Sequence, residues 1–143
     1  MKIALDVFGG DNAPESNIKG VFSYLDHYGN SAEEIILLGD RAQIETTIKS
    51  LSRDVSDVSI IHTSKVVGMN ERASRIFKEK PDSSLVKSIQ LVKDGEAQAA
   101  VSAGNTGALL TSSLFLIGKI PGIRRPAFAP FIPTNNGGFI LCD

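Results

Sequence analysis

Cysteine, histidine and tryptophan are nearly missing from this chain of 143 residues. The single cysteine, Cys142, excludes a disulfide bond within the chain and a zinc site built from cysteines. Cys142 lies in an apolar run, which is typical of a small core residue. The two histidines, His27 and His62, have no neighbouring ligand pattern, and His62 has no serine or cysteine partner for a catalytic triad. We therefore expect no metal and no cofactor.

The chain also lacks a strong net charge, which is −1, and a long apolar run. A nearly neutral chain without tryptophan, whose tyrosines and phenylalanines are scattered, does not fit a protein that binds nucleic acid. The most apolar stretch, 108–120, is too short to cross a bilayer. Residues 1–5 lead directly into an apolar strand and leave no room for a signal peptide. We expect a cytoplasmic protein.

The charges are unevenly distributed along the chain. Residues 1–64 contain five basic and ten acidic side chains, a net charge of −5, whereas residues 65–93 contain seven basic and three acidic ones, a net charge of +4. A basic segment of this kind can attract an acidic partner or an anionic substrate. The alternative is a set of solvated helix faces without a partner.

Short apolar runs alternate with helical patterns throughout the sequence. This alternation predicts an α/β fold in which a mostly parallel sheet is covered by helices on both faces. We expect one domain over 1–143, and the chain stops inside a predicted strand, as the N-terminal part of a longer protein would. The predicted strands are 3–8, 34–38, 58–62 and 98–102, with an antiparallel hairpin from 126–133 and 138–142. The predicted helices are Pro14 to Gly29 or Asn30, 41–51, 69–78, 85–94 and 106–118. The first is expected to bury Ile18, Val21, Phe22 and Leu25, and the second Ile44, Ile48 and Leu51.

Two glycine-containing turns follow strands and precede helices. They are Gly9-Gly10-Asp11-Asn12-Ala13-Pro14 and Ser102-Ala103-Gly104-Asn105-Thr106-Gly107. In a parallel sheet, ligands bind beyond the carboxyl ends of the strands, and free N–H groups at a helix N-terminus suit phosphate. Three further polar turns are expected at the same edge: Gly39-Asp40, Asp82-Ser83-Ser84, and 133–136.

Each of these features also has a purely structural explanation. Glycine at a strand-to-helix corner can serve backbone geometry alone. Asp6 can simply end a strand and Asp11 can form a turn. Arg124-Arg125 could bind phosphate with two parallel hydrogen bonds, although an exposed pair in a loop is the commoner case. Neither turn matches the glycine fingerprints of dinucleotide or nucleoside-triphosphate sites.

The chain resembles the phosphate acyltransferases of the PlsX family, which act in bacterial phospholipid synthesis. The resemblance runs through the whole chain and is most specific over 101–109. It departs from the family at Val7-Phe8, where alanine and methionine are common, and family members continue well beyond Asp143. The other segments that carry it are 3–6 with 9–15, Asp82-Ser83-Ser84, Gly122-Ile123 with Arg125-Pro126, and Pro133-Thr134 before Gly137.

The resemblance implies transfer of a long-chain acyl group from acyl carrier protein to inorganic phosphate. It also implies a three-layer α/β/α sandwich like that of phosphotransacetylase and isocitrate dehydrogenase, a homodimer, and peripheral membrane association of the full-length protein. The basic segment 65–93 would suit an acidic carrier protein, and the apolar face of 108–117 would border an acyl groove. We expect Asn105, Thr106 and Asp11 to be catalytic, and the phosphate to contact Gly9, Gly10, Ser102, Gly104, Gly107 and Arg125.

Three other functions remain open at this stage. One is an enzyme of the same fold that transfers acetyl groups between coenzyme A and phosphate. Another is a module that binds phosphate or acyl groups, or mediates dimerisation, without catalysis. An oxidoreductase on the isocitrate-dehydrogenase-like fold ranks last, because neither a nucleotide fingerprint nor a carboxylate metal cluster is visible.

Overall fold

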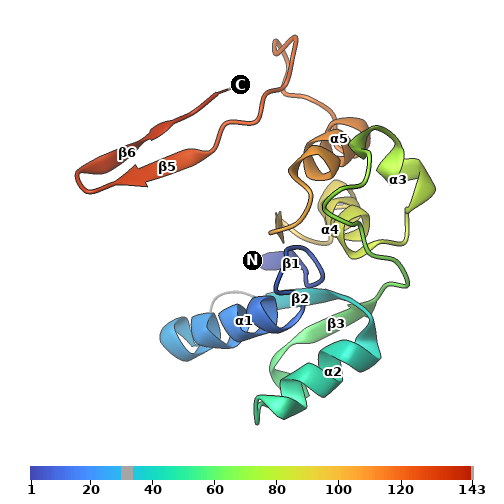
Figure 1. Cartoon of the computed structure of the whole chain (residues 1–143), viewed down its shortest axis with the longest axis vertical. Helices are drawn as coiled ribbons and strands as arrows, with labels where there is room; N and C mark the ends of the chain where they lie inside the picture. Colours follow the sequence, from blue (N-terminus) through green and yellow to red (C-terminus); the bar gives the residue numbers. More distant parts are fainter. Residues whose placement is uncertain (30–33, 143) are drawn as a thin grey trace.

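The computed structural model describes residues 1–29 and 34–142. Its centre is a sheet of four parallel strands in the order β3-β2-β1-β4 (Figure 1). Because β1 pairs with β4 in parallel, the carboxyl ends of the two strands lie side by side, with Asp6 opposite Ser102. The predicted parallel sheet is confirmed, with small shifts at the strand ends. Its strands are β1 (Lys2–Asp6), β2 (Glu34–Gly39), β3 (Ser59–His62) and β4 (Ala99–Ser102).

Helices cover both faces of this sheet. Successive side chains of a strand point to opposite faces, so Leu37 packs against α1 (Glu15–Tyr28) and α2 (Arg41–Ser50), while Leu38 packs on the other side with residues of α4 (Ser84–Lys93). Both leucines are fully buried. The predicted three-layer α/β/α arrangement is confirmed.

The ends of the first two helices follow the sequence closely. Gly29, with a φ of 74°, ends α1 as predicted, whereas Asn30 lies outside the described residues. Asp40 begins α2 by accepting a hydrogen bond from the N–H of Gln43 at 2.9 Å. Leu51, predicted as a core residue, follows α2 and is only half-buried. A short 3-10 helix, η1 (Val55–Asp57), then leads into β3.

A second group of helices packs beside β4. Helix α5 (Thr106–Leu116) contacts α4 and the short α3 (Ile76–Glu79), and their apolar side chains form a separate cluster. The predicted helix over 69–78 is wrong, since that segment contains only the 3-10 helix η2 (Ala73–Arg75) and the single turn of α3. The physical reason lies at Asn105, whose amide binds backbone carbonyls of the segment and so takes acceptors that a helix would need.

The last two strands form a hairpin that stands apart from the parallel sheet (Figure 1). Strands β5 (Phe131–Thr134) and β6 (Gly137–Ile140) pair antiparallel, with Phe131 opposite Ile140. The hairpin itself is confirmed, but its first strand is much shorter than the predicted 126–133. Prolines 126 and 130 have no N–H to donate to a strand ladder, which accounts for the late start.

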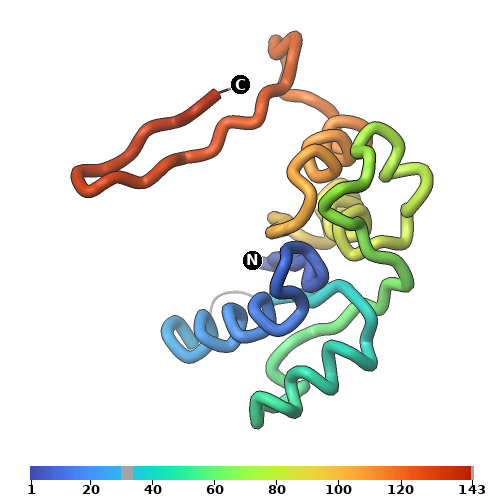
Figure 2. Tube along the Cα trace, in the orientation of Figure 1, coloured from blue at the N-terminus to red at the C-terminus, as the bar shows by residue number. Residues whose placement is uncertain are grey.

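The trace in Figure 2 shows that the path from α5 to the hairpin leads away from the helices, makes a tight loop and then runs to the hairpin. Within residues 1–29 and 34–142, no helix is both long enough and apolar enough to span a bilayer.

Candidate functional site

The two glycine turns lie against each other at the carboxyl ends of β1 and β4. A Cβ atom placed on Gly9 would lie 2.7 Å from the backbone nitrogen of Gly104 and 2.7 Å from Asp6 Oδ2. A Cβ atom on Gly10, whose φ is 102°, would lie 3.2 Å from the carbonyl oxygen of Ala103. The turns therefore form one packed unit, and there is no room for a ligand between Gly9 and Gly104.

Asp6 lies beneath this unit and is almost completely buried, with 2% of its surface exposed. Its Oδ2 accepts a hydrogen bond from Ser102 Oγ at 2.7 Å, and Ser102 Oγ in turn accepts one from the N–H of Gly104 at 3.0 Å. This chain of hydrogen bonds links β1 to the turn that begins α5. The N–H of Gly104 is thereby used within the protein.

The other carboxylate oxygen of Asp6 is buried without a hydrogen-bond partner among the described residues, and so is the hydroxyl of Ser84 in the first turn of α4. Burial raises the pKa of Asp6 above its ordinary value. Hydroxyl groups of Ser84 and Ser102 oppose this rise in pKa, although Ser84 makes no hydrogen bond of ordinary geometry. Asp6 is thus a carboxyl group held in an environment that disfavours its charge.

Asn105 joins the helix start to a distant loop. Its Oδ1 accepts a hydrogen bond from the N–H of Ala108 at 2.9 Å, which caps α5. Its Nδ2 lies within 3.0 to 3.2 Å of the carbonyl oxygens of Gly68, Met69 and Glu71. Every polar atom of this side chain has a partner inside the protein, so we assign Asn105 a positioning role.

An ion pair holds the same loop from its other side. Lys80 Nζ lies 2.5 Å from Glu71 Oε1 and 2.7 Å from the carbonyl oxygen of Val66, and Glu71 Oε1 also accepts a hydrogen bond from the N–H of Gly68. The hydrogen bond from Lys80 lowers the pKa of Glu71, and the one from the Gly68 N–H lowers it to a smaller degree. The sequence interpretation missed this pair, because its only signal was a basic segment with a few acidic residues.

Replacing Asn105 with alanine removes the cap and the tether together. We expect the free energy of unfolding to fall by about 2–4 kcal/mol, since a lost N-cap costs about 1 kcal/mol and three carbonyls in partly buried hydrogen bonds lose their donor. The matched control is Asp40→Ala, which removes the cap of α2 without a tether and should cost about 1 kcal/mol. Urea unfolding measures both, and equal losses for the two variants would show that the tether contributes nothing.

The start of α5 keeps two backbone N–H groups free. Those of Thr106 and Gly107 have no acceptor within the described residues, because the Asn105 side chain caps Ala108 and Leu109 bonds to the Asn105 carbonyl. Both residues are exposed. Free N–H groups and the positive end of the helix dipole together favour an anion at this point.

Comparisons with known proteins are consistent with this geometry. The model of a family described as "Fatty acid synthesis protein" matches residues 1–143. The chain belongs to this family. It is similar to a protein named phosphate acyltransferase from Exiguobacterium sp., at 44% identity over 100% of this chain and 43% of that protein, and to one of the same name from Listeria monocytogenes serovar 1/2a, at 46% identity over 100% of this chain and 41% of that protein. The chain thus spans less than half the length of these relatives.

Solved structures show the same fold at much lower sequence similarity. A phosphotransacetylase from Streptococcus pyogenes matches with a TM-score of 0.68 and 20% identity, over 98% of this chain and 45% of that one. The EutD phosphotransacetylase from Staphylococcus aureus matches with a TM-score of 0.62 and 20% identity, over 98% of this chain and 44% of that one. The predicted phosphotransacetylase-like fold is confirmed.

In this family member the other residues expected at the site are scattered. Asp11 is exposed in the glycine turn that follows β1 and has no hydrogen-bond or ion-pair partner within residues 1–29 and 34–142. Arg125 is exposed in the segment that follows α5, which Figure 1 shows leading away from the sheet. The turn at 133–136, expected at the sheet edge, instead joins β5 to β6, because in the described part of the chain these two strands pair only with each other. His62 accepts a hydrogen bond from the N–H of Arg41 and has a structural role.

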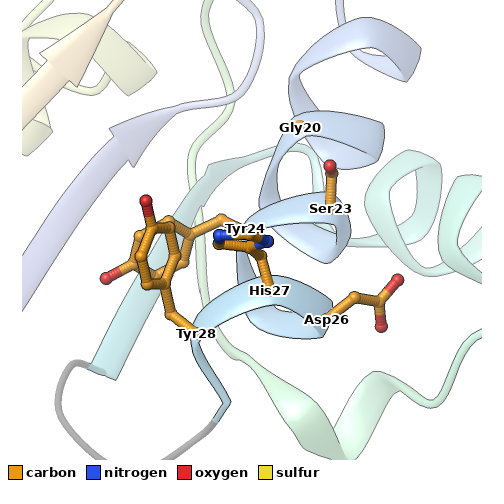
Figure 3. A pocket seen from close by; sticks show the side chains of 6 residues that line it. All are labelled: Gly20, Ser23, Tyr24, Asp26, His27 and Tyr28. Atoms are coloured by element: carbon orange, nitrogen blue, oxygen red, sulfur yellow. The ribbon is translucent and has the colours of Figure 1, made fainter.

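An apolar hollow of about 320 Å³ opens beside the exposed edge strand β4. It is lined by residues of β1, β2, β4 and α1, among them Leu5, Val21 and Val101, the last of which directly precedes Ser102. Another, more open hollow lies on the surface of α1 (Figure 3). Its lining residues all belong to that helix, where the rings of Tyr24 and Tyr28 are 4.9 Å apart, and it lies towards the opposite end of α1 from the glycine turn.

Proposed function

We propose that this chain forms the phosphate-binding part of a phosphate acyltransferase, which transfers a long-chain acyl group from acyl carrier protein to inorganic phosphate. The observation that carries the proposal is the pair of free N–H groups at Thr106 and Gly107, held in place by Asn105. The names of the relatives agree with this chemistry.

The proposed reaction needs no nucleophilic side chain, because phosphate itself attacks the thioester. A phosphate oxygen forms a bond to the carbonyl carbon, the carbon–sulfur bond breaks, and the departing thiolate takes up, by way of water, the proton that hydrogen phosphate loses. The protein then contributes position and charge stabilisation, which rigid N–H donors supply effectively. The Thr106 hydroxyl is exposed beside its own N–H and is a further donor to phosphate.

The remaining site residues have indirect roles in this proposal. Gly9 and Gly10 allow the close packing that fixes the α5 turn, and Ser102 and Gly104 connect that turn to Asp6. Asp11, at the tip of the first turn, is a candidate for orienting a cation that approaches the phosphate. Arg125 is the weakest candidate of the set, since its segment leaves the sheet.

We also propose the cellular setting that the family resemblance implies. The chain is one α/β domain at the N-terminal end of a longer cytoplasmic protein that forms a homodimer and associates peripherally with the membrane. The acyl chain is proposed to lie along the apolar surface of α5 or in the hollow beside Val101.

The test is phosphate-dependent release of carrier-protein thiol from palmitoyl-[acyl carrier protein], with hydroxylamine trapping the acyl phosphate. We expect turnover that disappears without phosphate, and no consumption of acetyl-CoA. Thermal stabilisation by phosphate without turnover would instead favour a binding module. Consumption of acetyl-CoA would favour an acetyltransferase.

The variant Thr106→Pro tests the N–H donor itself. Proline fits the first position of a helix, and the extended Asn105 that precedes it is compatible with proline, so the fold should persist while one donor is lost. We expect the KM for phosphate to rise at least about tenfold, as the loss of a hydrogen bond to a charged group implies. Thr106→Ala, which keeps the N–H and removes the hydroxyl and the γ-methyl group, is the control and should change this KM less.

A further inference from the structure

The basic side chains of 65–93 fall into two groups: some bind other groups of the protein, and others have no partner among the described residues. Lys80 is bound to Glu71, and Lys65 Nζ donates to the carbonyl oxygen of Glu79 at 3.5 Å. Arg72 and Arg75, by contrast, are exposed and have no ion-pair or hydrogen-bond partner for their side chains among the described residues. These two guanidinium groups are available to an anionic partner.

An aromatic pair includes Phe77, which follows Arg75 by two residues in the chain. Phe77 in α3 and Phe115 in α5 stack with their ring centroids 4.6 Å apart and their planes 12° from parallel. Phe115 keeps 61% of its surface exposed, and the exposed Lys78 lies over the Phe77 ring at 5.5 Å. Exposed arginines together with an aromatic pair have the composition of a protein interface, in which aromatic and arginine side chains provide most of the affinity.

This surface is joined directly to the candidate phosphate site. A Cβ atom on Gly107 would lie 3.0 Å from Ala73 Cβ, so η2 packs against the first turn of α5. The Asn105 amide also binds the carbonyl oxygens of Met69 and Glu71, just before Arg72. A partner that binds here is therefore held beside the free N–H groups of Thr106 and Gly107.

We propose that Arg72, Arg75, Phe77, Lys78 and Phe115, called here the 72–78 face, dock an acidic protein that carries the acyl thioester. This inference rests on the proposed function and adds the place where the acyl donor binds. The occupant has to be anionic to match the free cations and has to present its thioester at the start of α5. A protein with an acidic helix next to its thioester satisfies both conditions.

Charge and geometry favour a protein over a lipid surface. Juxtaposed clusters of about 4–8 basic residues are typical of segments that bind anionic membranes, whereas the 72–78 face has three. A membrane would also place the helix start against lipid headgroups rather than against a reactive thioester. Binding to vesicles is accordingly the competing outcome in the test below.

The experiment compares two double charge reversals in the full expressed protein. Arg72→Glu with Arg75→Glu alters the face, and Lys49→Glu with Lys93→Glu makes the same change of net charge on exposed residues of α2 and α4. Each variant is assayed with palmitoyl-[acyl carrier protein] and with palmitoyl-pantetheine, which has the same thioester without the protein. Both are checked for folding by circular dichroism.

We expect the first variant to lower kcat/KM for the carrier-protein substrate at least about tenfold, through the electrostatic part of association, and to weaken its salt dependence. Its kcat/KM for palmitoyl-pantetheine should change less than about twofold, and the control variant should resemble the wild type with both substrates. Equal losses with both substrates would contradict docking, as would unchanged kinetics with the carrier protein.

Direct binding separates this inference from the proposed function. Fluorescence anisotropy of labelled acyl carrier protein needs no turnover, so an inactive wild type that binds it through Arg72 and Arg75 refutes the phosphate reaction and retains the docking surface. An active wild type whose carrier binding survives the reversal refutes the docking surface alone. A third outcome would assign the 72–78 face to lipid: the charge reversal weakens binding to phosphatidylcholine vesicles with one quarter phosphatidylglycerol and leaves carrier-protein binding unchanged.

Discussion

Gly9→Ala is expected to destabilise the protein and to disturb its proposed phosphate site at the same time. The added methyl group would lie 2.7 Å from the Gly104 nitrogen and 2.7 Å from Asp6 Oδ2, and neither atom can move without breaking the contact between the two turns. Overpacking of this kind costs typically 1–3 kcal/mol, and we expect a loss of about 2 kcal/mol or more in urea unfolding. The KM for phosphate should rise because the start of α5 is displaced.

Gly20→Ala provides the matched control for this substitution. Gly20 lies in the exposed part of α1, and a Cβ atom there meets nothing within 4 Å. Alanine is the better residue inside a helix, so the same chemical change should stabilise the protein by about 0.5–1 kcal/mol. If Gly9→Ala and Gly20→Ala were equally stable, the contact between Gly9 and Gly104 would not be tight in solution.

This contact also shows where sequence interpretation stops. Apolar runs and helix spacing predicted the parallel sheet, and the strand–turn–helix pattern brought both glycine turns to one edge. The same pattern, with the family resemblance, led to the expectation that the phosphate contacts glycines of both turns. Whether facing glycines leave a gap or close one depends on the spacing of β1 and β4, which local sequence does not contain.

Asn105 illustrates a second limit. Its place before a helix predicted a polar group at the α5 start, and its cap on Ala108 fits that position. Its three carbonyl partners are 34 to 37 residues earlier in the chain, so no local pattern could indicate them. The same long-range contacts explain why the helical spacing of 69–78 did not produce a helix.

Asp6 should matter more for its hydrogen bonds than for its charge. In Asp6→Asn, the amide oxygen can accept from Ser102 Oγ, and the amide nitrogen takes the position of Oδ1, where it can donate to the otherwise unpartnered Ser84 hydroxyl. We expect Asp6→Asn to be at least as stable as the wild type at pH 7 and to keep its KM for phosphate. Asp6→Ala takes the acceptor from the Ser102 hydroxyl and opens a cavity, so it should lose roughly 2–4 kcal/mol.

The pH dependence distinguishes this interpretation from a requirement for the carboxylate. Burial raises the pKa of Asp6 above 3.8, so the folded protein holds this proton more tightly than the unfolded chain does. The contribution of Asp6 to stability is therefore complete below pH 3.8 and is lost as the pH rises through its folded pKa. Urea unfolding at several pH values above 3.8 should show the asparagine variant gaining stability relative to the wild type as the pH increases. If the wild type instead gains stability relative to the asparagine variant as the pH increases, the ionised carboxylate stabilises the two turns. Its charge then has a function that asparagine cannot replace.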